Sequence, residues 1–189
     1  VLYKLKSLGF QKVFSDNLAD ALGISSAQVR KDFSMYDLTG NKKGGYVVDS
    51  LLGKLNEILG KQMTQPIVIV GCGKMGNALM NYNGFASEGI RVVAGFDSDP
   101  TIIDPNAQIP IYDINDLQDV IAEEQVRVAI MSVPESRASM VLEMLVSAGI
   151  KGILNFAPIQ LKSSERCLVH NLSVLFELEN MFYFVNHMG

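Results

Sequence analysis

The sequence predicts an α/β protein with two domains, because two kinds of hydrophobic pattern follow one another along the chain. In the C-terminal two thirds, strand-like apolar runs alternate with helical stretches, as in a doubly wound parallel sheet with crossover helices. The apolar runs lie at residues 67–70, 91–96, 126–132 and 152–156, and the helical stretches at about 74–87, 114–124 and 136–148. The N-terminal third has mainly helical spacing.

A polar stretch at residues 60–66, closed by Pro66, separates the two patterns. We therefore expect a first domain at residues 1–62, a second domain at residues 66–168 and a C-terminal segment at residues 169–189. The chain starts at Val1 without a methionine and already with helical spacing, so we expect further residues to precede it.

Composition limits the classes of protein that fit. With 189 residues and 48% hydrophobic content, the chain can bury a substantial core. No apolar run reaches the roughly 18 to 20 residues that cross a bilayer, and no signal peptide is evident, so we expect a cytoplasmic protein without a membrane partner. Cys72 and Cys167 are the only cysteines and lack metal-ligand spacing, so we expect neither a disulfide nor a structural metal.

Charge is distributed unevenly between the two domains. Residues 1–61 hold nine basic and six acidic side chains, whereas the remaining residues hold seven basic and fourteen acidic ones. The first domain is therefore net positive within a chain whose total charge is −4. This asymmetry favours an anionic partner for the first domain.

Two short helices joined by a tight turn are predicted in the first domain. Gly23 ends the first helix, and the second starts at Ser25 or Ser26. Residues 41–46 have the composition of a hairpin tip, with Tyr46–Val48 as its return strand, and a further helix follows. The apolar positions that define the three helical faces are Leu18, Ala19 and Leu22, then Ile24, Val29 and Phe33, then Val48, Leu51, Leu52, Leu55, Ile58 and Leu59.

The second helix of this pair has an outer face suited to DNA. Gln28, Arg30 and Lys31 point outward, and Ser26 lies near the helix start. Arginine can pair with guanine and glutamine with adenine in the major groove, while lysine and serine contact phosphates. The hairpin with Lys42, Lys43 and Tyr46 would form a wing over the adjacent backbone, which completes a winged helix-turn-helix. The alternative is an ordinary solvated helix face.

A glycine-rich loop follows the first strand of the second domain. Gly71, Gly73 and Gly76 form a G-x-G-x-x-G pattern that also contains Lys74 and Met75 and opens a helix. Such a loop turns tightly, lets backbone amides approach a pyrophosphate, and packs strand against helix. The alternative, a mere glycine-rich turn, does not account for an acidic residue at the expected distance. The loop predicts a dinucleotide site in a Rossmann domain.

That acidic residue is Asp97, which ends the second strand 21 residues after Gly76. A carboxylate there binds a ribose diol and repels the 2′-phosphate of NADP, and no arginine follows it, so we expect NAD(H). The ends of the fourth and fifth strands should line the nicotinamide half, although ordinary loop residues are the alternative at each position. They supply Ser132, Val133, Pro134, Asn155, Ala157 and Pro158.

Catalysis is not expected. A dehydrogenase needs an acid or base beside the nicotinamide, and the only histidines are His170 and His187, which flank or lie in the apolar C-terminal segment. Cys72, inside the glycine loop, is either a small packed side chain or a redox-reactive thiol.

The C-terminal segment is predicted to be a dimerisation helix. Ten of the fourteen residues from Leu172 to Val185 are apolar, on all faces of a helix. Such a helix must be covered, and a small domain offers little surface to cover it. We expect insertion into a second subunit, and the alternative is packing on the chain's own sheet.

Six segments of the chain together carry a resemblance to a known family, namely Leu18–Ala19, Leu22–Gly23, Ser26–Ser34, Gly71–Gly76, Phe96–Pro100 and Gly149–Pro158. Through them, the whole chain resembles the Rex family of redox-sensing transcriptional repressors. The resemblance implies a homodimer with a swapped C-terminal helix that binds a palindromic operator with NAD⁺ and releases it when NADH binds.

This chain departs from the family pattern at two places. The wing carries Asp37, Thr39 and Lys43 where the family has more glycine and aromatic residues. Ser173 stands where the family's C-terminal helix begins with aspartate. If that carboxylate takes part in switching, this chain should respond less strongly to NADH.

Two other functions also fit parts of the sequence. One is an NAD(H)- or CoA-binding enzyme subunit, since related folds bind CoA at the same loop, but such a subunit does not need the N-terminal helix pair. The other is an NAD sensor that acts through protein contacts, which the unusual wing keeps open.

Overall fold

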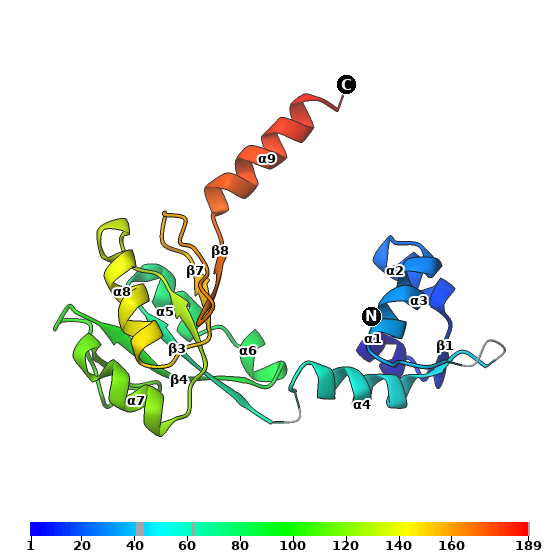
Figure 1. Ribbon diagram of the computed structural model, residues 1–189, viewed down its shortest axis with the longest axis horizontal. Helices are drawn as coiled ribbons and strands as arrows, with labels where there is room; N and C mark the ends of the chain where they lie inside the picture. Colours follow the sequence, from blue (N-terminus) through cyan, green and yellow to red (C-terminus); the bar gives the residue numbers. More distant parts are fainter. Residues whose placement is uncertain (41–43, 62, 189) are drawn as a thin grey trace. The chain divides into compact units, whose positions relative to one another are not determined.

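In a computed structural model, the chain divides into two compact units, Val1–Met63 and Thr64–Gly189. The structure describes residues 1–40, 44–61 and 63–188. Figure 1 shows both units with the element labels used below. The division falls in the polar stretch before Pro66, where the hydrophobic pattern changes.

The first unit consists mainly of helices around a small apolar core. Its elements are α1 (Leu2–Ser7), β1 (Lys12–Val13), α2 (Ser15–Leu22), α3 (Ser26–Met35), β2 (Tyr46–Val47) and α4 (Val48–Ile58). The buried core is formed by Val13, Leu18, Ala19, Val29, Leu38, Val48, Leu51 and Leu52. These positions recur at helical spacing because α2, α3 and α4 each turn one apolar stripe inward.

The turn between α2 and α3 is built as the sequence predicted. Gly23 ends α2 in the left-handed conformation with φ +66°, which glycine adopts without a Cβ clash. The Ser25 hydroxyl then accepts a hydrogen bond from the Gln28 N–H at 3.1 Å and caps the start of α3. The helix-turn-helix prediction is confirmed.

The strand prediction in this unit was wrong in its pairing. Tyr46–Val47 forms an antiparallel ladder with Lys12–Val13, near the start of the chain, rather than with a neighbouring hairpin strand. Val48 does not extend the strand, because it is the first residue of α4 and is 1% exposed in the core. The predicted wing residues Lys42 and Lys43 lie outside the described residues.

The second unit contains one parallel sheet with helices on both faces, which confirms the predicted doubly wound arrangement. The strand order is β5-β4-β3-β6-β7-β8, and all neighbours are parallel. The strands are β3 (Gln65–Val70), β4 (Ile90–Asp97), β5 (Ile111–Asp113), β6 (Val128–Met131), β7 (Gly152–Asn155) and β8 (Leu168–Asn171). The helical elements are α5 (Lys74–Met80), α6 (Gly84–Ser87), the short η1 (Ile114–Asp116), α7 (Leu117–Glu123), α8 (Glu135–Ser147) and α9 (Val174–Asn186).

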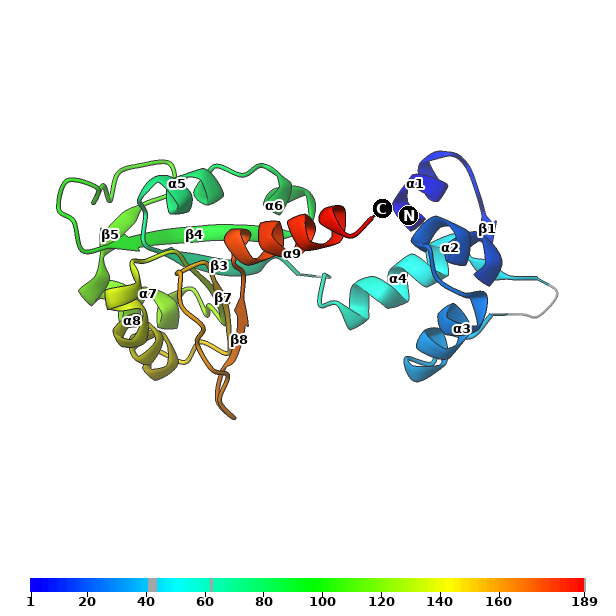
Figure 2. The same cartoon turned by 90° about the horizontal axis from the view of Figure 1, so that it is seen from above.

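The sheet is covered on both sides. Figure 2 shows α5 and α6 on one face and α7 and α8 on the other. Val68 and Val70 pack into the core cluster of α7 and α8, whereas Ile67 and Ile69 pack into the cluster of α5 and α6. This burial on both faces explains why β3 is a continuous apolar run. Successive strands are added on one side of β3 up to β5 and on its other side from β6 onward, so the strand order switches between β3 and β6. Ligands of such sheets bind at this switch point.

Two edge strands were missed in the sequence. β5 has only three residues, and β8 contains His170 and Asn171, so neither reads as an apolar run. Residues 168–171 therefore belong to the sheet, and the C-terminal helix starts only at Val174. The helix expected at 74–87 is interrupted after Met80, and α6 begins at Gly84.

α9 continues from the end of β8 (Figure 1) and buries none of its residues within this chain. Its large apolar side chains are between 50% and 67% exposed, including Leu175 and Phe182. The alternative of packing on its own sheet is therefore wrong for this chain. No helix in the described part of the chain is long and apolar enough to cross a membrane.

Candidate functional site

The three glycines of the loop after β3 differ in their surroundings. Gly71 has φ +89°, and a Cβ there would lie 2.5 Å from the Ser132 carbonyl oxygen. A Cβ on Gly76 would overlap the Gly71 carbonyl oxygen, which also accepts a hydrogen bond from the Ser132 hydroxyl at 2.7 Å. Gly73 differs, because a Cβ there would meet no atom within 4 Å. Gly71 and Gly76 thus shape the loop, and Gly73 leaves open space in front of it.

Asp97, at the end of β4, lies directly beside this loop. One carboxylate oxygen accepts a hydrogen bond from the Cys72 N–H at 2.7 Å, and the other accepts one from the Asp99 N–H at 3.0 Å. Each oxygen keeps a further lone pair, so the fixed carboxylate can accept hydrogen bonds from a vicinal diol. This is the geometry that a ribose next to a pyrophosphate loop requires.

A cavity of about 590 Å³ opens at this edge of the sheet. It is lined by predicted residues from the loop, from β4 and from the end of β6, namely Gly71, Gly73, Asp97, Ser132, Val133 and Pro134. Lys74, Met75 and Gly76 lie in α5 and do not line it. The open face of Gly73 and the Asp97 carboxylate therefore fit the pyrophosphate and one ribose of a dinucleotide.

The sequence reasoning missed the opposite wall of this cavity. Arg137 and Met140 on α8, and Ile102 and Ile114 after β4 and β5, also line the cavity. The sequence did contain a pattern that could have identified the two α8 residues. Arg137 and Met140 are three residues apart in the helix that follows Pro134, so they share a helix face with each other.

The residues predicted at the end of β7 do not reach the cavity. Asn155 is fully buried, and its side-chain nitrogen donates to the Ile159 carbonyl at 2.9 Å and to the Asn171 side-chain oxygen at 2.8 Å. Its side-chain oxygen accepts a hydrogen bond from the Ala157 N–H at 2.9 Å. Asn155 holds the loop together, so the structure does not support a cofactor contact by its side chain. Ala157 is also buried, whereas Pro158 is exposed.

Burial raises the pKa of the Cys72 thiol to about 12, and the negative charge of Asp97 adds to this effect. The thiol is therefore protonated at neutral pH and is a weak nucleophile. The structure favours the packed role for Cys72 over the redox-reactive one.

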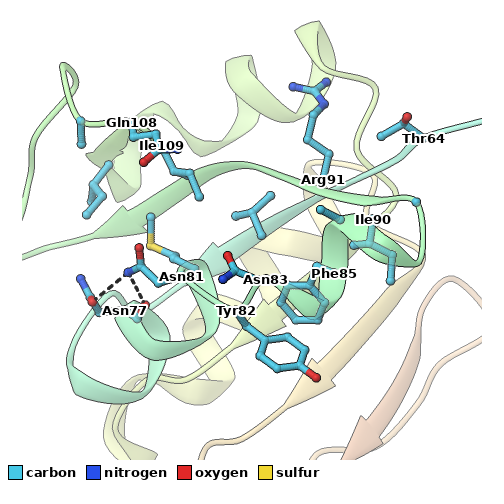
Figure 3. A pocket seen from close by; sticks show the side chains of 16 residues that line it. Thr64, Asn77, Asn81, Tyr82, Asn83, Phe85, Ile90, Arg91, Gln108 and Ile109 are labelled. Carbon is cyan, nitrogen blue, oxygen red and sulfur yellow. Dashed lines mark hydrogen bonds between the residues drawn. The ribbon is translucent and has the colours of Figure 1, made fainter.

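A second cavity of about 630 Å³ lies elsewhere in this unit, and Figure 3 shows its lining. Tyr82, Asn83 and Phe85 border it on one side, and Ile90 and Arg91, where β4 begins, border it on the other. Dinucleotides bind at the carboxyl ends of the strands, so this cavity at the opposite end is not the dinucleotide site.

The predicted DNA-binding residues of α3 differ in whether other side chains already bind them. Lys31 is exposed, and its side chain makes no hydrogen bond or ion pair with any residue the structure describes. The Arg30 guanidinium donates to the Ser15 hydroxyl at the start of α2, at 3.0 Å. The Gln28 side chain donates to Asp32 at 2.6 Å, and Ser26 is half-buried. Lys31 is the freest of the four.

Tyr46 does not stand on this outer face. Its ring packs edge-to-face on Phe33, with ring centroids 5.0 Å apart, and the residue is half-buried. This packing on the core side of β2 gives Tyr46 a structural role, and its contact with DNA stays a prediction. Asp37, which follows α3, has φ +52°, a conformation that glycine adopts more readily.

Comparisons with known families divide the chain as the fold does. Residues 1–34 match the family described as "Putative DNA-binding protein N-terminus", and residues 62–159 match the family described as "CoA binding domain". The chain is 36% identical over 183 residues to the redox-sensing transcriptional repressor Rex of Lactobacillus gasseri, covering 96% of this chain and 86% of that protein. The Rex of Listeria welshimeri is 34% identical over 97% of this chain and 86% of its own.

The chain belongs to the Rex family. Its fold also matches solved structures of RSP, a Rex-family repressor, at 29% identity. RSP in complex with β-NAD⁺ and operator DNA matches with a TM-score of 0.91 over 98% of this chain and 86% of that one. RSP in complex with β-NADH matches with a TM-score of 0.83 over 98% and 87%.

Rex relatives are named as transcriptional repressors and not as enzymes. In this member of the family, the His187 ring nitrogen lies 2.7 Å from the Tyr183 carbonyl oxygen at the end of α9, and His170 is exposed on β8. Neither histidine lines the cavity beside Asp97.

Proposed function

We propose that this chain is a DNA-binding transcriptional repressor that senses the NADH/NAD⁺ ratio. It binds a palindromic operator as a homodimer with NAD⁺ and leaves the operator when NADH is bound. One observation carries the proposal: a helix-turn-helix pair and a glycine loop with a fixed carboxylate, Asp97, occur in one chain of the Rex family.

NAD(H) is the cofactor that the cavity fits. Gly71 and Gly73 would accommodate the pyrophosphate, and Asp97 would accept hydrogen bonds from the adenosine ribose. Ser132–Pro134, which we expected beside the nicotinamide half, line the same cavity as Asp97 and would instead border the adenosine half. A bound nicotinamide supplies the signal through its oxidation state. The Asp97 carboxylate would repel the 2′-phosphate of NADP(H), so we expect a preference for NAD(H).

Operator DNA would be read by α3. Its exposed face presents Lys31, with Gln28 and Arg30 on either flank, and Ser26 at the helix start. Lys42 and Lys43 would contact the neighbouring backbone from the wing. RSP was crystallised with operator DNA, and this chain is similar to RSP over 98% of its length.

A homodimer explains α9. A helix with large apolar side chains on all faces is unstable in water unless another surface covers it. Because α9 buries nothing within its own chain, we propose that α9, and not the preceding strand β8, docks on a second subunit. A palindromic operator matches the twofold symmetry of such a dimer.

The proposal assigns no catalytic activity to this chain. His170 and His187 lie outside the cavity, and the Cys72 thiol is protonated at neutral pH, so none of these three side chains offers an acid or base for hydride chemistry there. We place the protein in the cytoplasm, where a regulator of transcription meets both DNA and the nicotinamide pool.

Coenzyme A is the second candidate ligand, because residues 62–159 match the family described as "CoA binding domain". The adenosine ribose of CoA carries a 3′-phosphate, which would approach the Asp97 carboxylate. The electrostatic repulsion favours NAD(H). NADH bound to the protein should therefore not be displaced by equimolar CoA.

The proposal is tested with a fluorescent palindromic duplex from the operator of a Rex relative. Fluorescence anisotropy is followed at fixed salt, because phosphate contacts make the affinity salt-dependent. We expect binding without cofactor or with NAD⁺, and release on addition of NADH. No binding of DNA by a chain that binds NADH would instead favour a sensor that acts through protein contacts.

A further inference from the structure

The cavity beside Asp97 corresponds to one half of a dinucleotide. It contains the glycine loop, the Asp97 carboxylate and the Ser132–Pro134 segment, but none of Asn155, Ala157 or Pro158 at the end of β7. In a doubly wound fold, the acidic residue after the second strand binds the adenosine ribose. The cavity is therefore where the adenosine half of the ligand would lie.

Arg137 is the one cation among the described residues that line this cavity. It occupies the first turn of α8, and Met140, three residues later, lies on the same face and also lines the cavity. Arg137 is exposed, and within the described chain its guanidinium has no hydrogen-bond or ion-pair partner. Asp97 and Asp99 border the same cavity without forming an ion pair with it.

Two groups of the adenosine half, the pyrophosphate and the ribose, are already assigned to residues of this cavity. The glycine loop would receive the pyrophosphate, and Asp97 would receive the ribose. The remaining group is the adenine ring, and the apolar side chains of Ile102, Ile114 and Val133 offer it a surface. A guanidinium is planar and weakly hydrated, so it stacks well on an aromatic face.

We propose that Arg137 stacks on the adenine ring of the bound nucleotide and sets the affinity for its adenosine half. The inference rests on the proposed function, since it assumes a dinucleotide ligand. Because the adenosine half is identical in NAD⁺ and NADH, Arg137 increases the affinity for both forms by the same factor. It tunes sensitivity to the size of the nucleotide pool and leaves the preference for NADH over NAD⁺ unchanged.

The test measures dissociation constants of NAD⁺, NADH and ADP-ribose by calorimetry on the full chain, with adenosine and nicotinamide mononucleotide as competitors. Arg137→Ala should raise the dissociation constants of NAD⁺, NADH and ADP-ribose by the same factor, about 3- to 30-fold. Competition by adenosine should weaken by that factor too, and competition by nicotinamide mononucleotide should not change. Arg166→Ala removes another exposed arginine of the same unit, outside this cavity, and should have no effect.

Arg137→Lys separates stacking from a contact with phosphate. Lysine keeps the charge and loses the planar group, so stacking predicts that it restores little of the affinity. Full affinity in Arg137→Lys, or a normal response to adenosine in Arg137→Ala, would overturn the stacking proposal.

Failure of this inference is distinguishable from failure of the proposed function. If the wild-type chain binds NADH and Arg137→Ala binds it equally well, the assignment of Arg137 is wrong and the proposed function stands. If the wild-type chain binds none of the nucleotides, both are wrong. Circular dichroism of each variant shows whether the fold is retained, which we expect for substitutions of an exposed side chain.

Discussion

The side-chain nitrogen of Asn155 donates a hydrogen bond to the side-chain oxygen of Asn171 at 2.8 Å, across the ends of β7 and β8. Asn171 in turn donates to the Leu161 carbonyl at 2.9 Å and accepts from the Leu161 N–H at 3.0 Å. Two residues later, Ser173 caps α9. The pair therefore connects the loop after β7 to the segment from which α9 starts.

Removing this pair should destabilise the second unit. Asn155→Ala would leave the Ala157 N–H and the Ile159 carbonyl without their present partners in the interior, and we expect a loss of about 3 kcal/mol in the free energy of unfolding. Urea denaturation measures the change. Asn81→Ala, which removes an exposed asparagine, should cost less than about 0.5 kcal/mol and serves as the control. Equal stabilities of the two variants would contradict the assigned role.

The glycine loop predicts different phenotypes for alanine substitutions at Gly73 and Gly76. Gly73→Ala should fold normally, because its Cβ meets no protein atom, yet it should weaken NADH binding at least tenfold by occupying the space before the loop. Gly76→Ala should reduce both stability and binding, because its Cβ overlaps the Gly71 carbonyl oxygen. Thermal unfolding together with NADH calorimetry distinguishes the two. Normal NADH affinity in Gly73→Ala would show that the pyrophosphate does not bind at this loop.

Lys31 is predicted to make a major contribution to DNA affinity from the first unit. Lys31→Ala should weaken operator binding about tenfold at moderate salt and, if Lys31 contacts phosphate, reduce the slope of log affinity against log salt by about one. Anisotropy titrations at several salt concentrations give both quantities. Lys54→Ala, on the exposed side of α4, is the matched control for loss of charge. The same loss in both variants would indicate that only overall charge matters.

Ser173 provides a test of the switch. Its hydroxyl accepts a hydrogen bond from the Phe176 N–H at 3.2 Å and caps α9, a role that aspartate fills equally well. Ser173→Asp should keep the helix and restore the family's carboxylate, so less NADH should be needed to release half of the bound DNA. Ser173→Ala should cost about 1 kcal/mol of stability through the lost cap without this gain. An unchanged NADH response in Ser173→Asp would show that the carboxylate is not limiting.

The nucleotide loop could be predicted from the sequence because its requirements are local. Gly71 and Gly76 are required by close approaches within the loop or to the neighbouring strand end at Ser132, and Asp97 lies at a fixed separation. Arg137 and Ile102 could not be found in the same way. They reach the cavity only because the sheet brings α8 and the loop after β4 to one edge.

Sequence reasoning failed where the partner of a residue is distant in the chain. β2 pairs with β1, more than thirty residues earlier, so a local hairpin was the wrong interpretation. Asn155 was predicted as a cofactor contact from its place at a strand end, but Asn171 and Ile159 use its side-chain amide. The strand β8 was missed because an edge strand can be polar on the side that nothing covers.

The central claim is that this chain responds to the ratio of NADH to NAD⁺. It is tested most directly by measuring the fraction of operator bound while the ratio and the total nucleotide concentration are varied independently, both cofactors being well above their dissociation constants. We predict that the bound fraction falls as the ratio rises and stays constant when the total is raised tenfold at a fixed ratio. A bound fraction that does not change with the ratio would contradict the claim.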